Sequence, residues 1–289
     1  SRRILNEIFK KFTFDLATIF VFELIFTKDV NADDACTKTG DVYDVVTDFC
    51  EAQPDEYEIV IFNLYLCTSS PTIPTTTSAV DLTSGGCTEI FNNPLGSTAA
   101  VTQGSALNLT GTYTRPPNDT YTHGYAIMDN VFGITASIEF AGNMTGQTGG
   151  TGTYCGTVAG SGTSNSSGDP SNSSVCSTSP VTAGKFVETL ESFGGSGGFE
   201  STAQVNNING TTAAITGIMV DSSGQLATTD ADVDKLEGLV TFADPVTFTD
   251  AVTEVTMSFN VGVGMSLYLS GGVNLGMGSG PFQAIITTN

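Results

Sequence analysis

Residues Phe12 to Phe26 read FTFDLATIFVFELIF, and this stretch decides how the rest of the chain is interpreted. Successive side chains of a β-strand point to opposite faces, so alternate positions of the segment would share one face. Apart from Thr18, that face carries only Phe and Leu: Phe12, Phe14, Leu16, Phe20, Phe22, Leu24 and Phe26. The sequence therefore predicts a long strand with one apolar face, which must be buried against another surface.

Two other interpretations of the same stretch compete with a strand. A membrane-spanning helix needs about 20 mostly apolar residues, and Asp15 and Glu23 interrupt a run that is already shorter. A secretory leader retained within residues 1–35 would fit the basic residues that precede the apolar run and the small residues that follow it. The leader stays open as an alternative, and the strand is the interpretation carried forward.

The composition is typical of an extended, turn-rich β protein. Of 289 residues only 13% are charged, 33 are Gly and none is Trp, while Ser and Thr are abundant. β-sandwiches and barrels can exceed 200 residues as one domain, so this length fits one large β body.

The charge is distributed unevenly along the chain. The first 28 residues hold five basic and three acidic residues, a net charge of +2, and the remaining chain holds four basic and 27 acidic residues, a net charge of -23. A basic arm on an acidic body favours attraction between the arm and a body surface, which can belong to another copy. Nucleic acid is disfavoured as a partner, because phosphate binding needs clustered Lys and Arg.

Six cysteines indicate a disulfide-bonded protein. They lie outside any Cys-x-x-Cys or Cys/His metal pattern. Spacing alone leaves the pairing open, and we favour neighbours because each bridge then closes a modest loop: Cys36 with Cys50, Cys67 with Cys87, and Cys155 with Cys176. Disulfides persist in oxidising compartments, so the sequence predicts an extracellular or cell-surface protein.

Six Asn-x-Ser/Thr motifs agree with that compartment. Each motif is weak evidence alone in a chain rich in Ser and Thr, and glycosylation requires a host that modifies asparagine. The candidate glycosylation sites are Asn108, Asn118, Asn143, Asn165, Asn172 and Asn209.

Apolar and alternating runs predict the strands of the body. Residues 57–66, YEIVIFNLYL, are typical of a central strand buried on both faces. Residues 40–52 show helical spacing of their apolar positions, which predicts a short helix. Further strands are expected at 106–113, 121–129, 132–140, 212–220, 238–242, 246–249 and 281–288. We therefore expect a mainly β protein with a β-sandwich or jelly-roll-like body, a long N-terminal extension strand and one or two short helices.

A second amphipathic ribbon lies near the end of the chain. Its large apolar residues alternate with Ser, Asn, Gly and Tyr, which predicts one continuous strand. Its length and apolarity match those of the N-terminal strand, so we expect it to line the groove that accepts that strand. The groove residues are Met257, Phe259, Val261, Val263, Met265, Leu267 and Leu269.

Few features of the sequence point to catalysis. His123 is the single histidine, and the chain has no P-loop or HExxH motif. Asp230, Asp232 and Asp234 could offer oxygen ligands to Ca²⁺ from one loop, but their spacing departs from an EF-hand. The sequence thus predicts a non-enzymatic protein without a cofactor.

We divide the chain into two parts. Residues 1–28 form an N-terminal arm with the strand 12–26, and residues 29–289 form a disulfide-bonded β body, which would subdivide near the Gly- and Ser-rich stretch 142–198.

This plan resembles that of extracellular filament subunits that assemble by donor-strand exchange, such as chaperone-usher pilins, TasA-like proteins and archaeal bundling-pilus subunits. The resemblance covers residues 12–26 and the overall plan. It implies a head-to-tail homopolymer on the cell surface, with surface receptors or matrix as further partners. The alternative is a monomeric secreted or cell-surface adhesive domain whose arm folds into its own sheet.

Deletion of residues 1–26 tests the role of the arm. Burying seven Phe or Leu side chains would contribute a gross gain on the order of 10 to 20 kcal/mol before entropy losses. We expect the truncated protein to be a soluble monomer by size-exclusion chromatography with light scattering. Polymers that persist unchanged after the deletion would contradict an intersubunit strand.

Overall fold

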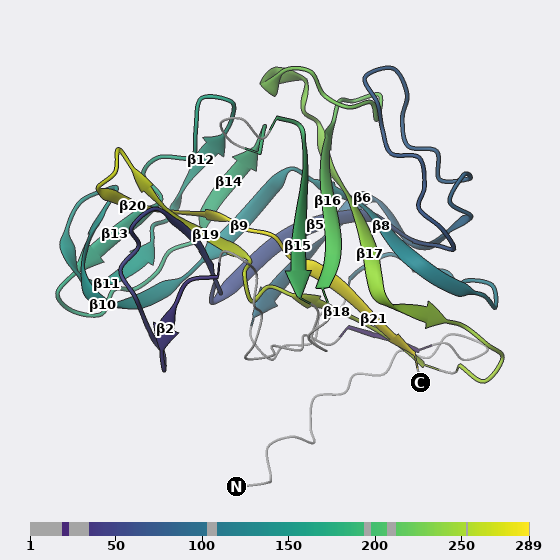
Figure 1. The fold of residues 1–289 in the computed structure, drawn as a ribbon, viewed down its shortest axis with the longest axis horizontal. Coiled ribbons are helices and arrows are strands. Elements are labelled where there is room, and N and C mark those ends of the chain that lie inside the picture. Colours follow the sequence, from purple (N-terminus) through teal and green to yellow (C-terminus); the bar gives the residue numbers. More distant parts are fainter. Residues whose placement is uncertain are drawn as a thin grey trace, which may run out of the picture.

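The computed structural model describes residues 19–22, 35–102, 109–193, 198–206, 212–252 and 254–288. These residues form a mainly β, sandwich-like body with two large sheets and one small sheet (Figure 1). The single helical element in these ranges is a 3-10 turn, η1, at Asp230–Asp232. The predicted fold class is therefore confirmed.

The larger sheet has ten strands. They are β5 (Glu56–Cys67), β6 (Cys87–Thr102), β7 (Thr112–Tyr113), β8 (Thr120–Asp129), β9 (Val131–Thr135), β12 (Gly160–Ser164), β14 (Phe186–Leu190), β15 (Glu200–Asn206), β16 (Thr212–Val220) and β17 (Lys235–Thr247). The order is β12-β14-β9-β5-β8-β17-β16-β15; in addition β6 pairs with β5, and β7 pairs with β6. The apolar strand expected at 57–66 is thus central, since β5 pairs with β6, β8 and β9.

The second sheet has eight strands. They are β2 (Lys38–Thr39), β3 (Val42–Tyr43), β4 (Phe49–Ala52), β10 (Ser137–Gly146), β11 (Thr151–Thr157), β13 (Ser174–Ser177), β19 (Met265–Ser270) and β20 (Asn274–Ser279). The order is β13-β11-β10-β20-β19-β4; in addition β3 pairs with β10, and β2 pairs with β3. Strands from within 142–198 occur in both large sheets, β11 and β13 in this one and β12 and β14 in the larger one.

The third sheet is small and contains the described part of the N-terminal arm. Its strands are β1 (Ile19–Phe22), β18 (Glu254–Asn260) and β21 (Gln283–Thr288). The order is β1-β18-β21.

The short helix predicted over residues 40–52 was wrong. The segment forms β3 and β4 instead, and β3 pairs with β10 while β4 pairs with β19. Backbone groups of a strand are satisfied by neighbouring strands, so the sheet gives this segment partners that the helical spacing could not reveal.

Several predicted strand boundaries also changed. The strand at 212–220 is observed as predicted, but the two short strands at 238–242 and 246–249 belong to one strand, β17, whose register shifts between Thr241 and Val246. The strand expected at 132–140 is interrupted at Ala136, where the chain leaves the ten-stranded sheet and enters the eight-stranded sheet.

Aromatic rings join the sheets in the core. Tyr57 of β5 packs against Phe132 of β9 with ring centroids 5.9 Å apart, and against Phe282 at 5.5 Å. Phe282 also contacts Phe259 of β18 at 6.1 Å. Burial of such rings contributes strongly to stability, and this cluster fixes the small sheet onto the larger one.

The three disulfides pair as expected from the sequence, Cys36–Cys50, Cys67–Cys87 and Cys155–Cys176. The second links register partners on β5 and β6, and the third links register partners on β11 and β13. Both half-cystines of the third bridge are buried. The bridges are typical of proteins that fold outside the reducing cytosol.

Removal of the Cys155–Cys176 bridge should destabilise the body. A bridge with a sequence separation of 21 contributes about 3 kcal/mol through loop closure, and the double variant C155A/C176A should lose at least that much in urea unfolding. C36A/C50A is the control, because it removes a bridge with a separation of 14 at partly exposed positions. Equal unfolding free energies for C155A/C176A and the unchanged protein would contradict the prediction.

Candidate functional site

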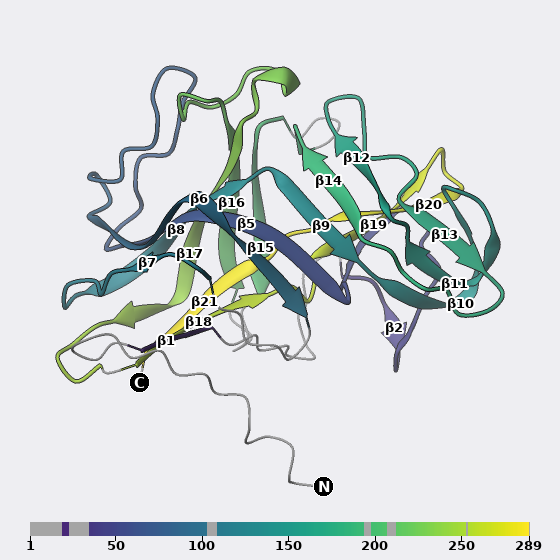
Figure 2. The same ribbon diagram turned by 180° about the vertical axis from the view of Figure 1, so that it is seen from behind.

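The strongest candidate site is the edge of the small sheet where the arm meets the body. β1 pairs with β18 in parallel, from Ile19 opposite Glu254 to Phe22 opposite Met257. β21 pairs with the other side of β18 in the antiparallel sense. The three strands lie side by side in Figures 1 and 2, close to the C-terminal end of the chain. The arm therefore adds an outer strand to a two-stranded ribbon from the end of the sequence.

This pairing covers only part of the predicted strand. Phe20 and Phe22 lie in β1. Phe12, Phe14, Leu16, Leu24 and Phe26 lie outside the described residues. Their role in an intersubunit strand stays a prediction.

The ribbon predicted over residues 257–269 is not continuous. It is divided into β18 and β19, which belong to different sheets. Between them the chain turns, with the Gly264 N–H donating to the Val261 carbonyl at 2.9 Å. A side chain at Gly264 would lie 3.1 Å from Val261 and 3.3 Å from the Tyr57 ring. The glycines that looked like small members of an alternating strand instead allow a tight turn against the core.

Most of the proposed groove residues face the core of their own chain. Met257 is the register partner of Phe22, and Leu269 is partly buried. The others are buried: Phe259, Val261, Val263, Met265 and Leu267. In this structure the arm meets only the beginning of the ribbon, and an acceptor role for the remaining residues stays a prediction.

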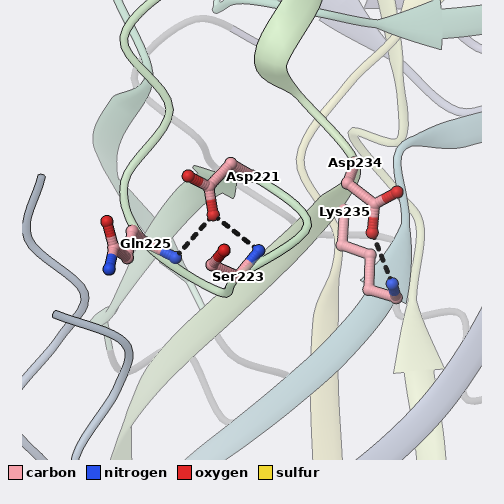
Figure 3. A network of polar contacts seen from close by, with 5 residues as sticks. All are labelled: Asp221, Ser223, Gln225, Asp234 and Lys235. Atoms are coloured by element: carbon pink, nitrogen blue, oxygen red, sulfur yellow. Dashed lines mark hydrogen bonds and ion pairs between the residues drawn. The ribbon is translucent and has the colours of Figure 1, made fainter. Parts of the chain in front are cut away.

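The acidic loop that suggested calcium binding forms η1, and each carboxylate has its own partner. Asp230 accepts hydrogen bonds from the Ser166 N–H and hydroxyl, and Asp232 accepts one from the Thr228 hydroxyl at 3.2 Å. Asp234 pairs with the ammonium of Lys235 at 2.6 Å, beside a turn closed by Asp221 (Figure 3). Within the described residues, no three His, Cys, Asp or Glu side chains gather as metal ligands.

His123 lies in the middle of the ten-stranded sheet, on β8. Its cross-strand neighbours are Cys67, which is disulfide-bonded, and Thr241. Its Nδ1 lies 2.8 Å from the Thr122 hydroxyl, and partial burial lowers the pKa of the imidazole. His123 is therefore a strand residue whose imidazole is hydrogen-bonded to its neighbour.

Three of the candidate glycosylation sites, Asn118, Asn143 and Asn172, are exposed, and Asn165 is partly buried. Asn108 and Asn209 lie outside the described residues. The exposed sites are accessible for a sugar, and glycosylation itself stays a prediction.

The sequence interpretation missed two buried carboxylates. Glu237 on β17 is 4% exposed and accepts a hydrogen bond from the Tyr125 hydroxyl. Burial raises the pKa of Glu237 to about 7, and the Tyr125 hydrogen bond and the charge of Lys235 only partly offset that effect. An acid between apolar neighbours, as in the run KLEGLV at 235–240, was the signal that could have identified it.

Glu188 on β14 is buried more deeply, at 2% exposed. Its Oε1 accepts a hydrogen bond from the Ser164 hydroxyl at 2.6 Å, and its Oε2 accepts one from the Ser279 N–H. Burial raises the pKa of this carboxyl, while the hydrogen bonds act in the opposite direction. Glu188 thus connects the ten-stranded sheet to β20 of the eight-stranded sheet.

Comparisons with protein-family models, with curated proteins and with solved structures found no match to this chain. In the part of the chain that the structure describes, no helix has the length and apolarity needed to cross a membrane.

The raised pKa of Glu237 predicts a specific pH dependence. Folded Glu237 keeps its proton to about pH 7 whereas its ordinary pKa is 4.5, so the folded state binds more protons than the unfolded state between these values and loses stability as pH rises through them. Relative to the unchanged protein, Glu237→Gln should gain on the order of 3 kcal/mol in unfolding free energy between pH 4.5 and pH 8.

Urea unfolding at several pH values measures this difference. The exposed Glu200→Gln is the matched control for loss of one charge, and it should not show the gain. An identical pH dependence for Glu237→Gln and the unchanged protein would overturn the prediction.

Proposed function

We propose that this chain is a structural subunit of an extracellular filament or pilus, in which the N-terminal strand of one copy adds to β18 of the next copy. The observation that carries the proposal is the parallel pairing of β1 with β18 at the edge of the small sheet. Strand addition of this kind uses main-chain hydrogen bonds for affinity and alternate side chains for specificity.

The pairing can be made within one chain or between two chains. The same backbone groups of β18 are satisfied whichever copy supplies the strand, so exchange between copies requires no new interface. Twelve residues, 23–34, separate β1 from the described body. Such a segment can span about 40 Å when extended, which is enough to reach a neighbouring subunit.

An exchanged strand would give an open polymer. The donor lies at the N-terminal end and the acceptor edge lies near the C-terminal end, so the contact is head-to-tail and propagates unless it closes into a ring. The net charge of +2 on residues 1–28 and -23 on the remainder favours approach of one subunit's arm to another subunit's body.

The disulfides and the candidate glycosylation sites support an extracellular location. Three disulfides and several exposed Asn-x-Ser/Thr motifs favour secretion and display at the cell surface. In that setting the filament's further partners would be surface receptors or matrix.

A monomeric secreted or cell-surface adhesive domain is the second candidate. The observation that favours it is that β1 pairs with β18 of the same chain. In that case the arm completes its own sheet, and the acceptor edge is not open to another copy.

A cysteine pair in the register of β1 and β18 distinguishes the two candidates. Phe20 and Val255 are Cα partners, so the variant F20C/V255C should form a disulfide wherever the strands meet. We expect non-reducing electrophoresis of purified native material to show a ladder of cross-linked multimers that collapses on reduction.

The single variants F20C and V255C are the controls for mispairing with the native cysteines, and neither should give the ladder. An internally cross-linked monomer as the only product would establish the self-completed domain and refute the filament. No cross-link at all would refute the strand pairing on which both candidates depend.

A further inference from the structure

A cavity of about 340 Å³ lies between the two large sheets. Its lining includes residues near opposite ends of the ten-stranded order, from Glu188 on β14 to Ser201 on β15, so this sheet curls around it. The volume falls in the range of pockets that hold small molecules.

The cavity has an aromatic lining. The rings come from four regions of the fold: β5 and β9 of the larger sheet, the segment that follows β14, β19 and β4 of the eight-stranded sheet, and the segment around β18 and β21. The aromatic residues are Phe49, Tyr57, Phe132, Phe193, Phe259, Tyr268 and Phe282. Such rings offer both apolar contact and negatively polarised faces to a ligand.

Glu188 is the acidic residue buried most deeply in this lining. Gly278 lies opposite it, and a side chain at that glycine would come within 3.2 Å of Glu188 Oε2. The absent side chain therefore leaves space next to the carboxylate. The Ser164 hydroxyl and the N–H and hydroxyl of Ser279 donate hydrogen bonds to Glu188, which hold the carboxyl group in place and leave it further acceptor capacity.

Two more acids lie along the cavity at less buried positions. Asp169 lines it and is otherwise exposed, which places Asp169 at the rim, and Glu51 on β4 is partly buried opposite Ser266. Glu237 also borders the cavity, but its carboxylate bonds to Tyr125, which does not line it. The adjacent Gly238 and its partner Ala126 do line it, so the Glu237 carboxylate lies on the other face of the sheet.

The charged residues in the described lining of the cavity are all acidic. Among the described residues that line it, none is Lys, Arg or His. An anionic ligand would therefore meet only like charges, whereas a cation would meet acids at both depths of the site.

We propose that this cavity binds a small organic cation, a protonated amine on an aromatic or aliphatic body, with the ammonium group at Glu188. The apolar body packs against Tyr57, Phe132 and Phe282, and Asp169 at the rim favours entry of the cation. An ammonium group in this site gains from the nearby carboxylate and from the ring faces together. The proposal is independent of strand exchange, because none of these residues belongs to β1.

Isothermal titration calorimetry at pH 7.5 with phenethylamine tests the proposal on the full chain. The matched ligands are 2-phenylethanol, which keeps the ring without the charge, and phenylacetate, which reverses the charge. We expect phenethylamine to bind at least tenfold more tightly than the alcohol, and phenylacetate not to bind.

Three variants locate the binding group. Glu188→Gln should weaken phenethylamine binding at least tenfold, and Asp169→Asn should weaken it less. The Glu237 carboxylate is buried on the other face of the same sheet, so Glu237→Gln is the matched control and should leave binding unchanged. Circular dichroism checks that each variant is folded, and Asp169→Asn keeps the test informative if Glu188→Gln does not fold.

Several outcomes would overturn the proposal. Equal binding of the amine and the alcohol would remove the role of charge. Loss of binding in Glu237→Gln equal to that in Glu188→Gln would show a general effect of mutation. Absence of amine binding at millimolar concentration would rule out this ligand class.

Discussion

Backbone pairing along β5 is the interaction on which the rest of the structure depends. This strand pairs with β6, β8 and β9, and its buried side chains alternate from Tyr57 to Ile61 and again from Leu64 to Leu66, on either side of a register shift. Its Tyr57 ring also meets Phe132 and Phe282, so the same strand holds the small sheet that carries the arm. A change in β5 would therefore affect the core, the cavity and the arm's acceptor edge together.

A buried, hydrogen-bonded carboxylate connects the two large sheets. Glu188 bonds to Ser164 and to the Ser279 backbone, which bridges the two large sheets through a carboxylate instead of an apolar contact. Burial of such a group costs stability unless hydrogen bonds satisfy it. Here the satisfied carboxylate lies at the lining of a cavity, where the same group can meet a ligand.

The pairing of the arm with the body depends on a backbone edge and not on side-chain motifs. β18 offers one edge to β21 and the other to β1, and main-chain groups on such an edge can pair with any strand of suitable register. Such an edge can accept a strand without any sequence motif in the body. This agrees with the scarcity of recognisable catalytic and binding motifs in the chain.

From the sequence alone one could predict the fold class, the central strand at 57–66 and the strand at 212–220, because alternation and apolar runs are local properties. The sequence favoured the three disulfide pairs through short loop closure but left the pairing open, and the structure contains these pairs. The sequence did not determine the fate of residues 40–52 or 257–269. Helical spacing at 40–52 was overruled by pairing with β10 and β19, and the ribbon at 257–269 turns at Gly264. Two features depend on packing between segments that are separated in the chain and could not be predicted from local patterns: Glu188 and Asp169 line the same cavity, and Phe22 lies opposite Met257. For the opening segment, the alternation at 12–26 predicted a strand, and the edge that it meets at positions 19–22 was set by the packing of the C-terminal strands.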